Sequence, residues 1–570
     1  MLKLPYGISN FEMLRENDYF YQDRSNFIEK LDNQPTRYHL FLRPRKFGKS
    51  LFLSMLHYYY GLEYKDKFAS FFGGLYIGEH PTKEANNYLV LRFDFSGIDT
   101  STPERTYDGF LTNVNLSASS FIADYSDYYT AAEKEEILSN KSPEATIKSL
   151  LTILENKNSA YRVFVLIDEY DQFANELLAF DTERFKESVS RNGFVRKFYE
   201  TLKIATGKGV VGRMFITGVS SITVDSLTSG FNIITNLSHN IAFHDMLGLT
   251  HPETRLLLAG CDISEAKIPE MLEDLSLWYN GYLFSENAKD RLFNTNMLLY
   301  FLLEYTQTLK YPRQMLDVNI MSDYKKVRSI FNIGGKEQER FELLEQIVKE
   351  GYIDFNLTIN FNLEAEFSEE NFLSLLYYMG ILTIEKPLSD ALRFVVPNYV
   401  IKQLYFEYFT AIYLKKTSLG DSYIKIRETI DKLVNEGNPE PFFKIVETVL
   451  LQNHSNRDEL SYNEKHLQTL MIGLLFPYKA FMVHSEYESG RQYPDIFLEK
   501  VPDRIINYEI VIELKYLKKK EEDKITAKRT EAKNQLESYL QTERFQREEV
   551  LGFYVIFIGG ELYEWGTSNT

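Results

Sequence analysis

The sequence predicts an α/β fold with more than one domain. The chain has 570 residues, more than one hydrophobic core accommodates, so about three or four domains are expected. Short β-branched or aromatic runs alternate with helical stretches through residues 1–245, which is typical of a mostly parallel sheet covered by helices on both faces. A Gly-Lys-Ser turn between the first strand and the next helix, and strands near the C-terminus, support this prediction.

The first domain is expected at residues 1–245. Its short apolar runs predict four strands, at 38–42, 88–95, 163–167 and 213–217. Residues 246–410 carry apolar residues at spacings of three and four, which predicts a mainly helical second domain. Within it, a helix starting near Phe372 and a short hairpin around Pro387 are compatible with a lid or a winged-helix-like domain.

The third domain is expected at residues 411–570, and it begins helical and then changes to strands. Its clearest strands are 508–516 and 552–559, with a helix at about 524–540 between them. No internal repeat or low-complexity tract interrupts these three domains, and proline is sparse, which predicts short linkers.

Composition limits the class of protein. The net charge of −17 argues weakly against a surface coated by nucleic acid, but a local basic groove is compatible with it. The single cysteine, Cys261, excludes an intramolecular disulfide and a zinc site made of several thiolates. The first residues lack the apolar core of a signal peptide, and no run approaches the roughly 18 apolar residues of a membrane span. We therefore expect a cytoplasmic protein without a membrane segment.

The sequence HLFLRPRKFGKSLFLSML predicts a phosphate-binding loop between a strand and a helix. Lys49 would neutralise the β- and γ-phosphates of a nucleotide, and the Ser50 hydroxyl would ligate Mg²⁺. Arg43 stands where the usual pattern has its first glycine, so a chance Gly-Lys-Ser turn is the alternative interpretation. The residues expected to bind the nucleotide are Arg45, Lys46, Phe47, Gly48, Lys49, Ser50 and Leu51.

The apolar run 163–167 ends in Asp168 and Glu169, where open α/β sheets bind their ligands. Asp168 would hold Mg²⁺ through water and Glu169 would polarise the attacking water, although a solvated strand end is the alternative. Thr217 closes the next strand and would sense the γ-phosphate, unless it is a simple turn residue. Candidates for an arginine finger, each more in keeping with a solvated surface residue, are Arg191, Arg196 and Arg213.

A second group of polar residues lies in the last domain. Asp495 precedes one strand and Glu513 follows 18 residues later (513 − 495) on the next strand, which allows one hairpin return. Because side chains alternate along a strand, Glu513 and Lys515 share one face, and Asp495 on the adjacent strand can join them. Two carboxylates that hold Mg²⁺ and a lysine that orients water make a metal-dependent hydrolysis site, whereas a cross-strand salt bridge is the structural alternative.

Further residues extend this second group. Gln535 and Tyr539 are four apart on the following helix, share a face, and would contact the substrate backbone or the metal-bound water. Glu486 and Glu488 lie upstream and would add a metal contact. Between Lys515 and Lys533 the chain has eight basic and four acidic residues, which would follow a phosphate backbone or form a solvated helix face.

Taken together, these segments resemble the bacterial AAA-ATPase-like proteins that carry a PD-(D/E)-x-K nuclease-like domain at the C-terminus. The resemblance covers nearly the full chain, including YFYQDRSNFIEKL, the loop RPRKFGKS, TGVSSITVDSLTSGFNIITNLS and YNGYLFSENAKDRLFNTNMLLYFL. The residues that match the nuclease motif of the family are Asp495, Glu513 and Lys515, followed by Gln535 and Tyr539. The resemblance implies ATP and Mg²⁺ as ligands, a restriction-endonuclease-like C-terminal fold, and a role in defence or mobile-element biology.

Two functions are compatible with these residues. In the first, ATP binding or hydrolysis gates phosphodiester cleavage of DNA or RNA in the last domain. In the second, the protein is a regulatory ATPase switch whose last domain binds a partner or nucleic acid without cleaving it. The intact set of Asp495, Glu513 and Lys515 favours the first, and the acidic net charge favours the second. AAA-type sites are often shared between subunits, so a homo-oligomer is a further expectation.

Overall fold

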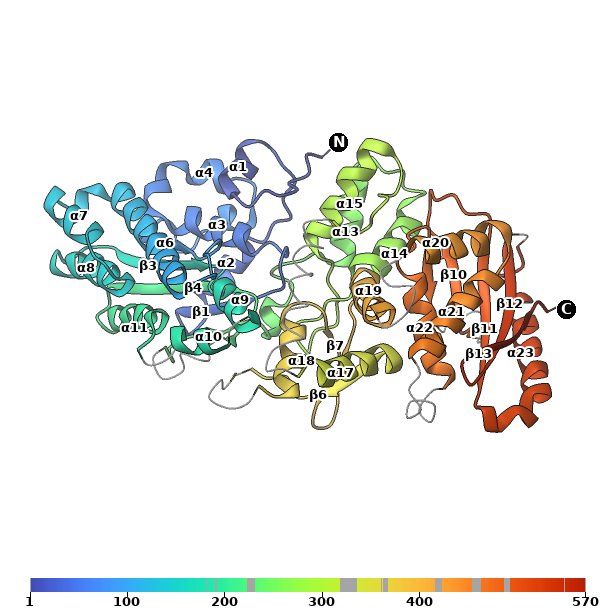
Figure 1. The fold of residues 1–570 in the computed structure, drawn as a ribbon. Coiled ribbons are helices and arrows are strands. Elements are labelled where there is room, and N and C mark those ends of the chain that lie inside the picture. The colour runs from blue at the N-terminus through green and yellow to red at the C-terminus, as the bar shows by residue number, and fades with distance from the viewer. Residues whose placement is uncertain are drawn as a thin grey trace. The chain divides into compact units, whose positions relative to one another are not determined.

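The structure is a computed structural model that describes residues 2–180, 182–189, 192–222, 231–317, 336–359, 361, 367–415, 423–453, 463–485, 493–547 and 549–568. These residues form two compact units, drawn in Figure 1. Unit 1 comprises Met1–Thr306, Leu316–Leu343 and Tyr352–Asn398, and unit 2 comprises Gln307–Met315, Leu344–Gly351 and Tyr399–Thr570. The three domains expected from the sequence stay a prediction.

Unit 1 is built on a five-stranded parallel sheet, seen in blue and green in Figure 1. The strand order is β2-β3-β4-β1-β5, and the bounds are β1 Tyr38–Leu42, β2 Tyr88–Asp94, β3 Arg162–Asp168, β4 Val211–Gly218 and β5 Thr235–Asn236. All neighbouring strands pair in parallel, which confirms the predicted sheet and its four predicted strands. β5 was not predicted, because two residues are too few to produce an apolar period.

Different helices cover the two faces of the parallel sheet. Tyr88 and Phe164 contact Tyr60 at the end of α3 (Lys49–Tyr60), with ring centroids 5.9 and 4.8 Å apart. Phe93 points to the opposite face, because side chains alternate along a strand, and it packs against Phe198 of α11 (Phe194–Gly207) at 5.2 Å. Helices therefore cover both faces, as the strand-helix alternation predicts.

The other helices of unit 1 begin at recognisable sequence signals in several cases. Thr102 and Ser142 cap two helices with their side chains, and a proline follows each of them. Thr250 and Glu253 form a capping box. The bounds are α1 Phe11–Glu16, α2 Asn26–Asp32, α4 Phe68–Phe72, α5 Tyr76–Glu79, α6 Pro103–Asp124, α7 Ala131–Leu138, α8 Pro143–Asn156, α9 Gln172–Phe180, α10 Thr182–Val189, α13 His251–Gly260, α14 Ile268–Tyr279 and α18 Glu369–Tyr378. Two helices are divided between the units: α15 Thr295–Thr308 belongs to unit 2 after Thr306, and α17 Glu337–Glu350 belongs to unit 2 after Leu343.

Unit 1 also contains a small antiparallel sheet. Its strand order is β6-β8-β7, with β6 at Tyr352–Phe355, β7 at Thr383–Pro387 and β8 at Leu392–Val395. β7 and β8 form the hairpin that was expected around Pro387, and α18 precedes it as expected. β6 extends the hairpin at one edge and was missed, because its four residues lie far from the hairpin in the sequence.

Unit 2 contains a five-stranded mixed sheet, drawn in orange and red in Figure 1. The strand order is β13-β12-β11-β10-β9, and only β11 and β12 pair in parallel. The strands are β9 Phe481–His484, β10 Ile496–Lys500, β11 Glu509–Leu517, β12 Val550–Ile558 and β13 Glu561–Gly566. The helices are α19 Tyr399–Lys415, α20 Tyr423–Asp431, α21 Glu440–Asn453, α22 Glu464–Leu475 and α23 Ile525–Leu540. The predicted strands near 508–516 and 552–559 and the helix between them are confirmed.

The mixed sheet is also buried on both faces. Phe497 of β10, Val511 of β11 and Tyr554 of β12 share one hydrophobic cluster with Leu536 of α23, so α23 covers that face. Phe553, which precedes Tyr554 and therefore points the other way, packs on Trp565, which also contacts Phe443 of α21. Within the described residues, no helix combines the length and the apolar character that crossing a membrane requires.

Candidate functional sites

The phosphate loop of unit 1 joins β1 to α3. Lys46 and Gly48 have positive φ angles of 67° and 101°, and Gly48 caps α3, whose first residue is Lys49. A glycine suits this cap, because a Cβ would strain a left-handed backbone. The first N–H groups of a helix have no helical acceptor, so the start of α3 can receive an anion. The Gly-Lys-Ser turn therefore has the local geometry that a phosphate-binding loop requires.

A cavity of about 540 Å³ lies beside this loop. That volume is in the range of small-molecule sites. Residues from separate parts of the chain line it, within segments 5–24, 45–52, 94–96, 168–172, 246–249 and 295–299. All seven loop residues that were expected to bind a nucleotide, 45–51, are among them. Phe47 is also anchored behind the loop, where its ring packs edge-on against Tyr282 and Phe284 at 5.0 and 5.4 Å.

Lys49 and the acidic end of β3 meet in this cavity. The Lys49 ammonium donates to the carbonyl of Pro44 at 3.3 Å and lies 3.8 Å from Glu169 Oε1. Burial raises the pKa of Glu169, and Lys49 opposes that rise. Burial also raises the pKa of Asp168, which is opposed by a hydrogen bond with Ser50 and by the charge of Lys49. The four residues expected to act together on the phosphates and Mg²⁺ are therefore close neighbours.

Two oxygen atoms at this end of the sheet are buried without a hydrogen-bond partner. They are Glu169 Oε2 and Thr217 Oγ1. Glu169 also holds a left-handed φ of 47°, which is uncommon for a residue other than glycine. Orphaned buried oxygens and such backbone strain cost stability and concentrate at functional sites. Oxygen donors of this kind, with Ser50 and Asp168, suit Mg²⁺, which prefers carboxylate, hydroxyl and water ligands.

In unit 2 the strand register brings the second group of residues together. β10 and β11 pair antiparallel with Ile496 opposite Ile512, so Asp495, one residue earlier, lies opposite Glu513. Asp495 Oδ2 accepts a hydrogen bond of 2.7 Å from the N–H of Leu514, which confirms that placement. The main-chain carbonyl of Asp495 accepts another of 2.7 Å from Gln468 on α22. The hairpin and the helix therefore fix both sides of Asp495.

Lys515 is surrounded by carboxylates. Its ammonium lies 2.6 Å from Glu513 Oε1, 3.6 Å from Glu531 Oε1 and 3.8 Å from Glu464 Oε1. Burial lowers the pKa of Lys515, but these carboxylates outweigh it and raise the pKa above its usual value. Burial and the neighbouring Glu513 together raise the pKa of Asp495 to about 8. In this arrangement Lys515 is ion-paired, and Asp495 favours its protonated form at neutral pH.

Gln535 and Tyr539 approach the same place from α23. Burial raises the pKa of Tyr539, and the charge of the neighbouring Glu513 adds to that rise. Glu513 Oε2 and Gln535 Oε1 are buried without a hydrogen-bond partner. These free oxygens and the Asp495 carboxylate suit a hard cation, although no group of three or more His, Cys, Asp or Glu side chains within the described ranges is arranged to hold a metal. Glu486 and Glu488 lie outside the described residues.

Comparisons with known proteins assign each of the two sites to a family. Residues 5–228 match the family described as Predicted AAA-ATPase, and residues 462–563 match the PD-(D/E)XK nuclease superfamily. The chain carries an AAA-ATPase-like N-terminal region and a PD-(D/E)XK nuclease superfamily domain. The phosphate loop lies in the first region, and Asp495, Glu513 and Lys515 lie in the second.

Two individual proteins are similar to parts of the chain. An uncharacterized protein in the vnfD 5′ region of Azotobacter chroococcum mcd 1 is 29% identical over 294 residues, which are 50% of this chain and 49% of that protein. The chain thus spans about half the length of this curated relative. A Walker-type ATPase of Pyrococcus abyssi has 14% identity and a TM-score of 0.40, with 69% of this chain and 97% of that protein covered.

Sequence reasoning missed Asp94 in the AAA-ATPase-like region. Asp94 ends β2 and pairs in register with Asp168 at the end of β3, and both line the cavity beside the phosphate loop. Its charge contributes to the raised pKa of Asp168. The signal that could have found it is the rule that was applied to Asp168, because Asp94 also follows an apolar run at a strand end.

Asp171 and Gly218 of the AAA-ATPase-like region have structural roles that the sequence did not reveal. The carboxylate of Asp171 is fully buried and accepts from the N–H groups of Val219 and Ser220 and from the side chain of Asn175. It thereby fixes the chain that leaves β4. Gly218 is required next to it, because a Cβ there would lie 2.3 Å from Asp171 Oδ1.

Arg43, which replaces the first glycine of the loop pattern, points away from the cavity. It is buried at 1% exposure, and its guanidinium donates to the main-chain carbonyls of Leu42, Ser238, Phe243 and His244. Burial lowers its pKa to about 9. Arg43 therefore ties the start of the loop to the segment 238–244 and leaves phosphate contacts to the residues that follow it.

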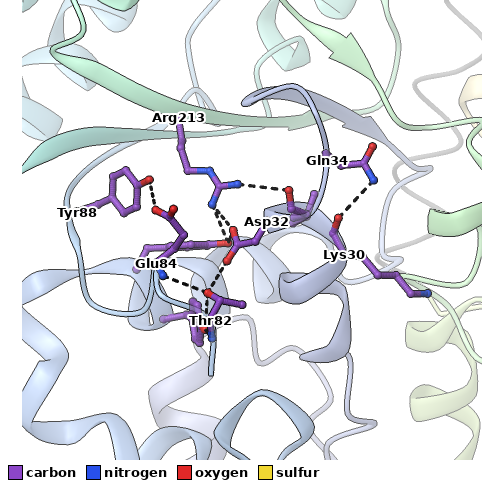
Figure 2. A network of polar contacts seen from close by, with 10 residues as sticks. Lys30, Asp32, Gln34, Thr82, Glu84, Tyr88 and Arg213 are labelled. Carbon is purple, nitrogen blue, oxygen red and sulfur yellow. Dashed lines mark hydrogen bonds and ion pairs between the residues drawn. The ribbon is translucent and has the colours of Figure 1, made fainter. Parts of the chain in front are cut away.

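The arginine-finger candidates have different environments. Arg213 is buried at the start of β4, where it pairs with Asp32, as Figure 2 shows. It also donates to the carbonyl of Leu31. Its expected solvated surface position is wrong, because the Asp32 carboxylate provides a buried partner for the guanidinium. Arg196 pairs with Glu200 along α11 at 3.0 Å, and Arg191 lies outside the described residues.

In the nuclease superfamily domain, sequence reasoning missed Glu464. It begins α22, and its charge acts on Asp495, Glu513, Lys515 and Tyr539. No spacing rule links a helix start to a hairpin about 30 residues later in the sequence. The basic excess after Lys515 is offset by pairing: Lys524 contacts Glu521 at 2.8 Å and Arg529 binds Glu564 through two nitrogens.

Proposed function

We propose that this protein binds and hydrolyses ATP and couples that cycle to a Mg²⁺-dependent nuclease site that acts on nucleic acid. One observation carries the proposal: each unit contains a buried lysine beside a glutamate, together with buried oxygens that have no hydrogen-bond partner. The match of residues 5–228 to the Predicted AAA-ATPase family and of residues 462–563 to the PD-(D/E)XK nuclease superfamily supports this proposal. A role in defence or mobile-element biology is part of this proposal.

In the first site the roles follow from position. Lys49 would leave the Pro44 carbonyl and Glu169 and bind the β- and γ-phosphates, for which the start of α3 supplies N–H donors. Glu169, relieved of Lys49, would accept a proton from the attacking water. Thr217 would donate its orphaned hydroxyl to the γ-phosphate. Ser50 and Asp168 would hold Mg²⁺, which supplies charge neutralisation for the phosphates when it is bound.

In the second site Asp495 and Glu513 would hold Mg²⁺, which supplies Lewis-acid stabilisation of the phosphate when it is bound. Lys515 would orient the water that attacks phosphorus, and Glu513 would position the Lys515 ammonium through the 2.6 Å ion pair. Gln535 would accept a hydrogen bond from a water molecule through its unpartnered amide oxygen, or donate its amide N–H to the substrate backbone, while Tyr539 would hold Glu513 or a water molecule. Glu464 would add a further carboxylate at the edge of the site.

The alternative function is a regulatory ATPase switch whose last domain binds a partner or nucleic acid without cleaving it. A specific observation favours it: Glu513 and Lys515 are only 2% and 3% exposed and form an ion pair of 2.6 Å with one another. A phosphodiester reaches this pair only if the surroundings rearrange. The same burial is compatible with a nuclease that stays closed until ATP opens it.

Two matched variants test the two halves of the proposal, and phosphate release and nucleic acid cleavage are both measured on each purified variant. Glu169→Gln keeps the side-chain volume but removes the charge, so nucleotide still protects the protein from thermal unfolding while phosphate release is lost. Glu513→Gln leaves phosphate release unchanged and removes Mg²⁺-dependent release of nucleotides from DNA or RNA. Phosphate release by Glu169→Gln at the wild-type rate would contradict the first half, and cleavage by Glu513→Gln at the wild-type rate would contradict the second.

A further inference from the structure

The first turn of α15 is tied to the nucleotide cavity. Asn296 and Leu299 line that cavity. Asn294 caps the helix by accepting from the N–H groups of Asn296 and Met297 at 3.0 and 3.2 Å. Its amide nitrogen also donates to the carbonyl of Arg45 in the phosphate loop at 3.4 Å. The start of α15 and the phosphate loop are therefore held together by one side chain.

The chain comes back to the same cavity wall a short distance beyond α15. Asp317 is 3% exposed and belongs to unit 1. It accepts a hydrogen bond of 3.4 Å from the amide of Asn296 and another from the hydroxyl of Tyr6, whose neighbours Pro5 and Gly7 line the cavity. The intervening segment, residues 307–315, belongs to unit 2. This segment, called the linking segment below, is thus bounded on both sides by residues anchored at the nucleotide cavity.

Within unit 2 the linking segment holds the turn between β10 and β11. The N–H of Tyr311 donates to the carboxylate of Asp503 at 3.0 Å, and the guanidinium of Arg504 donates to the carbonyl of Pro312. Tyr311 is buried at 8% exposure, so this contact is part of the packed unit. The two strands that the turn joins carry the nuclease residues, with Asp495 immediately before β10 and Glu513 on β11.

We propose that the linking segment transmits the nucleotide state of the first site to the β10–β11 hairpin and thereby regulates the nuclease site. The inference rests on the proposed function, because it requires a nucleotide in the cavity. A nucleotide between the phosphate loop and α15 displaces the first turn of the helix and Asp317. A continuous helix passes that displacement to residue 308, and the linking segment passes it to Asp503 and Arg504.

The effect at the nuclease site follows from the geometry of the hairpin. A shift of its turn changes how β10 lies against β11, and the last contact of the pair is the bond between Asp495 Oδ2 and the N–H of Leu514. Loosening that bond frees the Asp495 carboxylate for a cation. Asp503 and Arg504 are therefore positioning residues, which act on Asp495 and Glu513 through the strands and not through contact with substrate.

Hydrogen exchange of the full-length protein tests the proposal without relying on cleavage. Adding Mg²⁺ and a non-hydrolysable ATP analogue should change the exchange rates of residues 307–315, residues 501–508 and Leu514 by about fivefold or more, the lower range of allosteric coupling. In Asp503→Ala, the response at residues 295–299 should persist while the response at 501–508 and Leu514 is lost. Asp503→Asn, whose amide oxygen can still accept from Tyr311, should retain the response.

A matched control lies on the same turn. Ile505 is 93% exposed, so Ile505→Ala should respond like the wild type. Binding of the analogue is measured separately by equilibrium dialysis. Bound analogue with no change at 501–508 in the wild type, or an unchanged response in a folded Asp503→Ala, would overturn the inference and leave the proposed function standing. Absence of binding would overturn the proposed function together with the inference.

Discussion

Two buried lysines, one in each unit, lie beside a glutamate, but their surroundings differ in charge: cationic and acidic residues both line the cavity around Lys49, whereas carboxylates surround Lys515. Lys49 lies 3.8 Å from Glu169 and donates a hydrogen bond of 3.3 Å to the Pro44 carbonyl, in a cavity that Arg45 and Lys46 also line. Lys515 lies 2.6 Å from Glu513, with Glu531 and Glu464 within 3.8 Å and Asp495 close enough to affect its pKa.

The difference indicates which ligand each site attracts. The loosely held Lys49, beside a helix N-terminus, can exchange its partners for the phosphates of a nucleotide. Lys515 is outnumbered by carboxylates, so the second site gains stability from a cation and not from an added anion. A phosphodiester therefore binds well there only together with a metal, whereas a nucleotide can enter the first site as the anion itself.

The largest expected effect comes from Lys49→Ala. The phosphates lose the only cation placed at the start of α3, and we expect ATP turnover to fall by about 100-fold or more, as when one essential transition-state donor is removed. Phosphate release measures the effect. Lys83→Ala is the control, because that exposed side chain does not line the cavity and its loss should leave turnover near the wild-type rate. Unchanged ATP turnover in Lys49→Ala would contradict the claim that Lys49, unlike Lys515, binds the phosphates of a nucleotide.

Lys515→Ala should abolish nucleic acid cleavage while ATP turnover continues. The attacking water loses its orienting group, while the carboxylates that pair with Lys515 all belong to unit 2. Cleavage and phosphate release are measured in parallel, with Lys519→Ala as the control because Lys519 is exposed just beyond the same strand. Loss of both activities in Lys515→Ala would contradict the proposal that unit 1 hydrolyses ATP independently of cleavage in unit 2.

Arg43→Gly restores the usual loop pattern, yet we expect it to weaken the protein. Four main-chain carbonyls lose their buried donor, so the free energy of unfolding should fall by about 1–3 kcal/mol. Chemical denaturation of the full-length protein, followed through the unfolding transition of unit 1, measures this loss. Arg43→Lys should lose less stability than Arg43→Gly but more than none, because an ammonium cannot reach all four carbonyls. A gain in stability or in ATP turnover would show that the phosphate loop does not depend on Arg43.

The smallest effect is a pH dependence of stability without metal. The pKa of Asp495 rises from 3.8 to about 8 on folding, so the folded protein retains a proton that the unfolded chain releases between these values. In EDTA, stability should therefore fall as the pH rises from about 4 to 8. Asp495→Asn should lessen this fall, and Mg²⁺ should offset it in the wild type at pH 8. Parallel melting curves for both proteins across this range would contradict the charge argument.

Sequence patterns predict most of the fold because the central strands are continuous apolar runs. The strands at 38–42 and 163–167 differ from β1 and β3 by no more than one residue at either end. β5 and β6 were not predicted, because strands of two and four residues are too short to show the alternation of apolar and polar residues. Their place in a sheet depends on partners distant in the sequence. The small sheet and its third strand are fixed by tertiary pairing and not by local propensity.

The candidate sites divide in the same way. Asp168 and Glu513 follow from strand position and side-chain alternation, which act over short distances. Glu464 enters the nuclease site through the packing of α22, and Arg43 through contacts about 200 residues away, so neither position follows from local spacing. Asp94 was within reach of the strand-end rule and was overlooked. The catalytic and metal-binding roles of the predicted residues stay predictions.

The most direct test of the central claim is cleavage of plasmid, single-stranded DNA and RNA by the purified protein with Mg²⁺, with and without ATP, beside an Asp495→Ala variant. We predict cleavage of at least one substrate, its loss in Asp495→Ala, and a rate that depends on ATP. Absence of cleavage in every wild-type reaction, with ATP turnover intact, would contradict the nuclease assignment and favour the regulatory switch.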